Sequence, residues 1–111
     1  MDEDITKFVG NDRFAARAGI ELVRVEAGYA LARMEITENH LNGVNIVQGG
    51  AIFTLADYAF AAASNSKGVI TLGVNASISY FKPPKGKTLS AEAREVFSGR
   101  KLCEYSVDVF D

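Results

Sequence analysis

The sequence has little of several residue types, and each shortage excludes a class of protein or site. A single cysteine, Cys103, excludes an intramolecular disulfide and indicates a reducing compartment, so we expect a cytoplasmic protein. The one histidine, His40, has no second histidine or cysteine cluster at ligand spacing, so no metal site is expected. Twelve basic against fourteen acidic residues give a net charge of −2, without the basic excess of a nucleic-acid-binding protein. No apolar run reaches the ~18 residues of a membrane-spanning helix, so neither nucleic acid nor membrane is an expected partner.

Length and composition indicate one globular domain over residues 1–111. Of the 111 residues, 48% are apolar and 23% are charged, which is ordinary for a folded protein in water. The acidic residues at positions 2–4 lack the basic region with which a signal peptide begins. Asp12 can cap a short helix, and Gly19 can end it.

Hydrophobic periodicity predicts an α+β fold. The expected elements are a short helical segment over 4–18, strands over 20–26 and 29–37, a polar connection over 38–48, a helix over 51–64, a strand over 69–81, and strands over 88–97 and 102–110. One long helix against antiparallel strands is a two-layer arrangement, here with a sheet of about five strands wrapped around the helix.

The predicted helix over 51–64 is apolar on every side. Eleven of its 14 residues are apolar and no glycine or proline interrupts it. A helix that is apolar all round must be buried all round, and one small sheet covers only one side. We therefore expect a second subunit to cover the rest.

Asp57 is the anomaly within this helix, because it is the only charged residue between His40 and Lys67. Burial of an unpaired carboxylate costs free energy, so such a group has either a bonding partner or a functional role. Two interpretations stay open. Asp57 is either a structural carboxylate satisfied by a hydroxyl such as that of Tyr58 or by backbone amides, or a general base or nucleophile with a perturbed pKa.

The tripeptide Gln48-Gly49-Gly50 opens the same helix. Free amides at a helix N-terminus can bind an oxyanion or a polarised carbonyl, although two glycines can also simply make a turn. Gly50 and Asp57 are seven residues apart, or about 10 Å along the helix axis, so they cannot both reach one carbonyl from the same helix. If both act, the amide and the carboxylate come from different subunits, as two antiparallel helices around a two-fold axis allow.

The remaining candidate residues lie in connections. Asn42 is either a turn-former or a ligand of the substrate. Basic residues gather in the two turns after the predicted strand over 69–81, and they are either solvated loop charges or a patch for the phosphates of a nucleotide-bearing substrate. The lysines of the first of these turns are Lys82, Lys85 and Lys87.

The motifs together resemble those of the hotdog-fold acyl-CoA thioesterases of the phenylacetate-degradation (PaaI-like) group. The resemblance runs from about Phe14 to the C-terminus. It is carried by Leu41-Asn42-Gly43, by the run from Gln48 to Asp57, by Ala59-Phe60-Ala61 and Ser64-Asn65-Ser66, and by the segments Ile78 to Pro83 and Gly86 to Leu89.

The resemblance implies a hotdog fold, with homodimers often paired into homotetramers, and hydrolysis of an acyl-CoA thioester at a site shared between subunits. It places the catalytic acid on Asp57, the amide that polarises the thioester carbonyl on Gly50 or Gly49, and the approach-loop asparagine on Asn42. Lys82, Lys85 and Lys87 would take the phosphates of CoA. No cofactor is implied, since coenzyme A is part of the substrate.

Three departures from the family pattern qualify these expectations. Gln48 replaces the histidine of the usual His-Gly-Gly, so no proton is carried at that position, and a non-catalytic acyl-CoA or small-ligand binding protein stays open as the alternative function. Gly73 stands where some relatives place a serine or threonine. The family also continues into one more strand, so we expect either a smaller sheet or an incomplete C-terminus. Small residues on the helix, Ala59, Ala61, Ala62 and Ala63, favour an aryl-acetyl or medium-chain acyl group.

Overall fold

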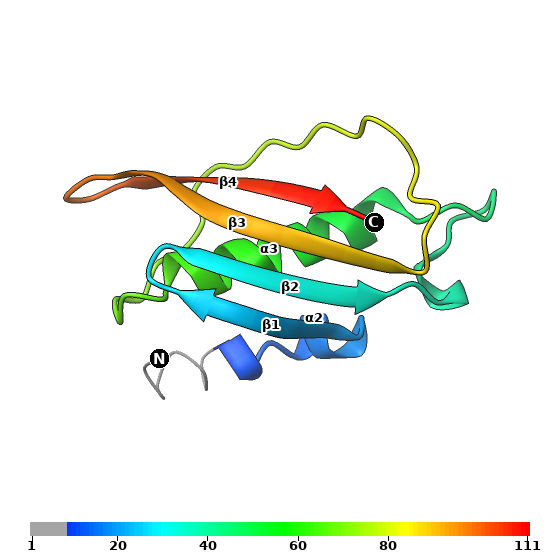
Figure 1. The fold of residues 1–111 in the computed structure, drawn as a ribbon, viewed down its shortest axis with the longest axis horizontal. Helices are drawn as coiled ribbons and strands as arrows, with labels where there is room; N and C mark the ends of the chain where they lie inside the picture. Colours follow the sequence, from blue (N-terminus) through cyan, green and yellow to red (C-terminus); the bar gives the residue numbers. More distant parts are fainter. Residues whose placement is uncertain (1–8) are drawn as a thin grey trace.

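The computed structural model describes residues 9–111, so the part of the predicted helical segment before residue 9 lies outside the described residues. One long helix lies across one face of an antiparallel sheet (Figure 1), which confirms the α+β prediction. The sheet order is β1-β2-β3-β4. The elements are α2 (Arg13–Arg17), β1 (Ile20–Glu26), β2 (Tyr29–Glu35), the 3-10 helix η1 (Glu38–His40), α3 (Gly49–Ser64), β3 (Thr88–Ser98) and β4 (Cys103–Phe110).

The local signals of the N-terminal half are confirmed. The carboxylate of Asp12 accepts a hydrogen bond of 2.9 Å from the amide of Ala15 and caps α2. Gly19 follows the helix with a φ of 79°, which an L-residue with a side chain rarely adopts. The predicted hairpin of β1 and β2 forms, and its antiparallel register pairs Ile20 with Met34.

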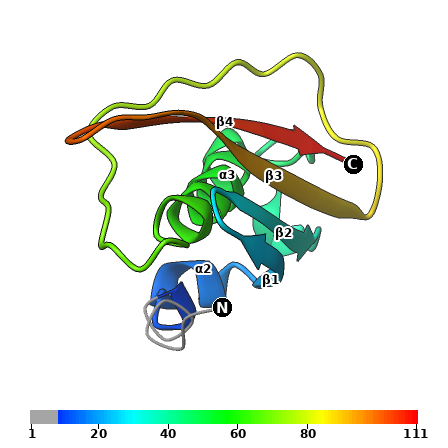
Figure 2. The ribbon, with the colours of Figure 1, turned by 60° about the vertical axis from the view of Figure 1, so that its left-hand side comes forward.

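The prediction of a strand over residues 69–81 is wrong, and the sheet therefore has four strands rather than about five. The segment runs outside the sheet as an extended connection (yellow-green in Figure 2) and makes no sheet hydrogen bonds. Alternation of apolar and polar residues defines the two faces of a strand. A strand also needs a neighbouring strand whose backbone accepts and donates its hydrogen bonds, and alternation does not show that one is available. The segment's apolar side chains remain largely exposed, 75% at Leu72 and 83% at Val74.

The core is built on small side chains that let α3 approach the sheet closely. Ala30 pairs with Ala93 and Ala32 pairs with Ala91 across β2 and β3, and all four are 0% exposed. Larger side chains close the core in the middle of α3 and at one end of the strand pair. These are Leu55 on α3 and the cross-strand pair Met34 and Leu89.

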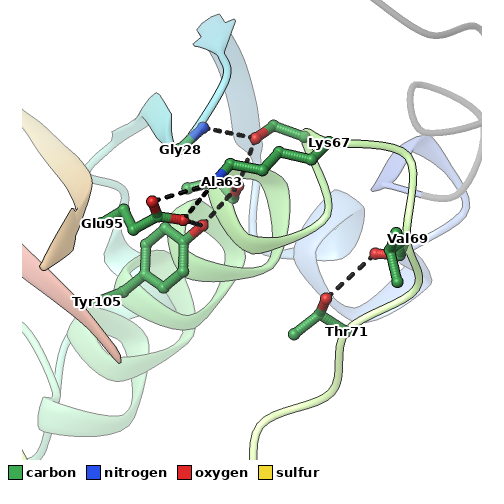
Figure 3. A network of polar contacts seen from close by, with 8 residues as sticks. Gly28, Ala63, Lys67, Val69, Thr71, Glu95 and Tyr105 are labelled. Carbon is green, nitrogen blue, oxygen red and sulfur yellow. Dashed lines mark hydrogen bonds and ion pairs between the residues drawn. The ribbon is translucent and has the colours of Figure 1, made fainter. Parts of the chain in front are cut away.

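A polar network fixes the C-terminal end of α3 against the sheet (Figure 3). The Glu95 carboxylate on β3 accepts hydrogen bonds from the Lys67 ammonium, at 2.8 and 3.0 Å, and from the Tyr105 hydroxyl on β4, at 3.0 Å. These donors, Lys67 first, hold the pKa of Glu95 below its ordinary value. The Tyr105 hydroxyl also lies 3.3 Å from the Ala63 carbonyl at the end of the helix. Strands and helix are thus joined at one end by charge-assisted hydrogen bonds.

The single chain buries only one side of α3, and the expected second subunit over the other sides remains a prediction. The sheet-facing side of α3 is buried, whereas Gly50, Phe53 and Asp57 are exposed. These three positions recur at helical spacing and so form one face, which we call the open face of α3. The sheet of this chain does not reach it.

Candidate active site

Two free backbone amides mark the start of α3. The amides of Ala51 and Ile52 donate to the Gln48 carbonyl, at 2.9 and 3.3 Å, and the Gln48 amide donates to the His40 carbonyl at 2.8 Å. Within residues 9–111, the amides of Gly49 and Gly50 have no such acceptor. Both therefore remain available to an oxygen atom that carries negative charge at the positive end of the helix.

The side chain of Gln48 lies over the second of these glycines. A Cβ atom at Gly50 would stand 2.5 Å from Gln48 Oε1, so a side chain there would displace the glutamine. Gln48 makes no capping hydrogen bond to the helix and is exposed. The predicted group Gln48-Gly49-Gly50 thus lies together at the start of α3. Because glycine has no side chain, the amides of Gly49 and Gly50 are not shielded by their own residues.

Asp57 lies two turns further along the open face of α3. Although it is exposed in the single chain, neighbouring protein atoms remove part of its hydration. This desolvation raises the pKa of Asp57 above its ordinary value of 3.8, and the negative charge of Asp12 raises it further. No hydrogen bond to the Asp57 carboxylate forms within residues 9–111, which disfavours a structural carboxylate held by Tyr58. A carboxylate with a raised pKa and no protein partner is a better base than an ordinary aspartate.

The structure keeps Gly50 and Asp57 on the same face but does not bring them together. Their seven-residue separation along a straight helix is about 10 Å. A reacting carbonyl needs contacts of about 3 Å to both groups, so one chain cannot supply both to one substrate. The expectation of a site completed by a second copy remains a prediction.

The structure gives Asn42 the role of turn-former. Its Oδ1 accepts hydrogen bonds from the amides of Val44, at 2.9 Å, and Ile46, at 3.3 Å, and so closes the connection before α3. That connection returns to the helix start through a bridge between Leu41 and Val47. The oxygen of Asn42 is occupied by its own loop, which leaves its Nδ2 group as the part that could meet a ligand.

His40 is buried, at 8% exposure, although its place in a polar connection suggests an exposed side chain. Its Nδ1 accepts from the Thr37 amide at 2.9 Å, and its Nε2 lies 2.6 Å from the Ala18 carbonyl. Acceptance at Nδ1 places the proton on Nε2, so the ring is neutral and both nitrogens are used. His40 is therefore a structural link between η1 and the end of α2.

The three candidate lysines are exposed on the connection between residues 81 and 88, near the end of the molecule where α3 begins (Figure 1). Asp111 fixes the middle of this connection, because its Oδ2 accepts from the amides of Lys85, at 2.6 Å, and Gly86, at 2.9 Å. These two donors hold the pKa of Asp111 below its ordinary value. Sequence reasoning missed Asp111, whose partners lie 26 and 25 residues away. The basic candidates Lys82, Lys85 and Lys87 thus flank an ordered turn.

A pocket of about 370 Å³ lies between α3 and the residues just before α2. Its lining residues are Val9, Asn11, Asp12, Tyr58 and Ala61. Of the four helix alanines expected to make room for a substrate, only Ala61 lines it, because Ala59, Ala62 and Ala63 are fully buried in the core. The volume falls within the range of about 300–1,000 Å³ of small-molecule pockets.

A further residue at this site, Tyr80, was missed because the sequence places it in a predicted strand. Its hydroxyl donates to the Gly49 carbonyl at 3.0 Å across 31 residues of sequence. The other end of the same connection is tied to the far end of α3, where Asn65 and Thr71 exchange hydrogen bonds. No local pattern in the sequence indicates either contact.

Comparison with known proteins identifies the family. The sequence model of the Thioesterase superfamily matches residues 44–111, which include the start of α3, Asp57 and the lysine-bearing connection. The chain belongs to the thioesterase superfamily. Within this family it is 41% identical over 100 residues to a putative esterase of Archaeoglobus fulgidus, covering 89% of this chain and 65% of that protein. To the acyl-coenzyme A thioesterase PaaI of Escherichia coli it is 34% identical over 100 residues, covering 89% and 71%.

Solved structures of the superfamily show the same fold. The E. coli PaaI structure matches with a TM-score of 0.89 and 31% identity over 94% of this chain and 76% of that one. A hypothetical thioesterase protein from Streptococcus pneumoniae, solved with coenzyme A, matches with a TM-score of 0.85 and 26% identity, covering 94% and 82%. The expected resemblance to the PaaI-like group and the hotdog fold are confirmed. Within residues 9–111, α3 and the shorter helices are too short or too polar to cross a membrane.

Proposed function

We propose that this protein hydrolyses acyl-CoA thioesters at a site shared between two copies of the chain. The observation that carries the proposal is the Gly50 amide, which lies on the same open face as the Asp57 carboxylate. Among residues 9–111, neither this amide, nor that of Gly49 beside it, nor the Asp57 carboxylate has a hydrogen-bond partner. Family relatives named acyl-CoA thioesterase, and a relative solved with coenzyme A, support the substrate class.

The reaction divides between the two ends of the open face. The Gly50 amide of one copy binds the thioester oxygen and stabilises the negative charge that develops there. Asp57 of the other copy takes a proton from water, whose oxygen then bonds to the carbonyl carbon. Alternatively, the carboxylate attacks that carbon itself, and water then hydrolyses the mixed anhydride to release the acid and restore Asp57. In both routes the carbon–sulfur bond breaks, and the CoA thiolate leaves and takes up a proton. The raised pKa of Asp57 makes its carboxylate a stronger proton acceptor than an ordinary aspartate.

Binding of the substrate uses the surroundings of the two groups. The pocket of about 370 Å³ beside Tyr58 and Ala61 takes the acyl group, and its size suits an aryl-acetyl or medium-chain acyl substrate. The exposed Lys82, Lys85 and Lys87 attract the CoA phosphates. Gln48 and the Nδ2 group of Asn42 position the acyl end. A cytoplasmic homodimer, paired into a homotetramer, is part of the same proposal.

A panel of acyl-CoAs, assayed for free thiol release, tests the function. We expect turnover of phenylacetyl-CoA or of a medium-chain acyl-CoA, and a loss of at least about 10²-fold in kcat for Asp57→Asn. Asp108→Asn, which changes an exposed aspartate on β4, is the matched control and should retain activity. A loss below threefold in Asp57→Asn would remove that residue from the mechanism. Binding of acyl-CoA without thiol release would instead favour the non-catalytic binding protein.

A further inference from the structure

Tyr80 touches the peptide group that carries the proposed oxyanion donor. Its hydroxyl donates to the Gly49 carbonyl at 3.0 Å. That carbonyl and the Gly50 amide belong to one peptide group, so they share one planar, delocalised unit. Helix geometry uses one lone pair of the Gly49 oxygen for the amide four residues on, and the Tyr80 hydroxyl takes the other.

The tyrosine ring packs closely over the glycine at position 49. A Cβ at Gly49 would stand 3.2 Å from Tyr80 Oη and 3.3 Å from its Cζ, closer than most such contacts. The first glycine of the pair therefore admits the phenol, while the second presents its amide. The two glycines therefore have different roles, and the sequence alone does not show which glycine has which role.

The connection that carries Tyr80 is held at both ends of α3. Asn65, at 0% exposure, accepts from the Thr71 amide at 2.7 Å and donates to the Thr71 carbonyl at 3.0 Å. The Tyr80 hydroxyl makes the corresponding contact at the helix start, with a ring that is 53% exposed. The connection thus places Tyr80 at Gly49, while hydrogen bonds to the buried Asn65 hold the opposite end of the connection.

We propose that Tyr80 is a positioning residue that orients and polarises the Gly49–Gly50 peptide group for the thioester oxygen. This inference rests on the proposed function. A hydrogen bond accepted by an amide carbonyl draws electron density toward its oxygen and makes the N–H of the same group a stronger donor. Tyr80 strengthens the Gly50 amide without touching the substrate.

The substitution Tyr80→Phe removes the hydroxyl and keeps the ring, and Ser79→Ala removes a neighbouring exposed hydroxyl as the matched control. Cooperative strengthening of about 10–30% per bond, applied to an oxyanion contact, predicts a kcat about 1.5-fold to eightfold lower in Tyr80→Phe. We expect KM to change less than twofold, since the substrate loses no contact. Ser79→Ala should leave both constants unchanged.

The amide proton of Gly50 gives a readout that does not depend on activity. In nuclear magnetic resonance spectra we expect it to move upfield in Tyr80→Phe, as a weaker donor does, and to stay in place in Ser79→Ala. An unmoved Gly50 signal in Tyr80→Phe overturns the inference, and so does a moved signal with unchanged kcat in an active enzyme. If the wild-type protein releases no thiol from any acyl-CoA, the proposed function fails, while the Gly50 signal still decides whether Tyr80 polarises the peptide.

Discussion

Replacement of Asn65 by alanine should destabilise the protein strongly, because this fully buried side chain attaches the connection over residues 69–81 to α3. Its Oδ1 accepts from the Thr71 amide at 2.7 Å, and its Nδ2 donates to the carbonyls of Ala61, at 2.8 Å, and Thr71, at 3.0 Å. Three such bonds at about 0.5–1.5 kcal/mol each give a loss of about 1.5–4.5 kcal/mol in the free energy of unfolding. At about 4 °C per kcal/mol, Tm should fall by about 6–18 °C.

Urea unfolding followed by circular dichroism, at fixed protein concentration, measures this loss. Asn75→Ala, at an exposed position of the same connection, is the matched control and should change the free energy by less than about 0.5 kcal/mol. Asn65→Asp keeps the volume but turns an oxygen toward two carbonyl oxygens, so it should cost at least as much as alanine. A loss below about 0.5 kcal/mol in Asn65→Ala would refute the conclusion that Asn65 holds the connection in place.

Three further predictions follow from the core and the site. Ala32→Leu places a larger side chain between β2 and α3, where exposure is 0%, and should lower the free energy of unfolding by about 1–3 kcal/mol in a urea titration. The raised pKa of Asp57 means that the folded protein disfavours its charge, so its contribution to stability is lost as the pH rises through that pKa. Asp57→Asn should therefore have a higher Tm than wild type at pH 7, and thermal melts should show no difference at about pH 3; a lower Tm at pH 7 would contradict the sign. Asp111→Ala frees the amides of Lys85 and Gly86 and should raise KM for acyl-CoA about threefold to tenfold with kcat unchanged, whereas an unchanged KM would show that the lysine turn needs no such support.

The elements that local periodicity can specify were predictable from the sequence. The hairpin of β1 and β2 follows from alternation over residues 20–37, and α2 begins at Asp12 because that side chain can cap only the amides just after it. The run from Gln48 to Asp57 was also readable, because a long motif of the family lies within one continuous helix.

The features that depend on distant partners were not predictable. The alternation over residues 69–81 has the period of a strand, but a ladder needs a neighbouring backbone, and the sequence does not say which one is available. The burial of His40 and the exposure of Asp57 depend on how α2 and the sheet pack against α3. Tyr80 reaches Gly49 across 31 residues, and no spacing rule links the two.

Mixing two inactive variants tests whether two copies of the chain complete the site. Asp57→Asn removes the base. Gly50→Pro removes the amide donor of the same chain at a first-turn position where proline is tolerated, and it also displaces Gln48. Random reassociation makes half of the dimers mixed, and each mixed dimer has one intact site of two, so the mixture should regain about one quarter of wild-type activity. Mass spectrometry confirms that mixed dimers form. Mixed dimers without any regained thioesterase activity would contradict the shared site.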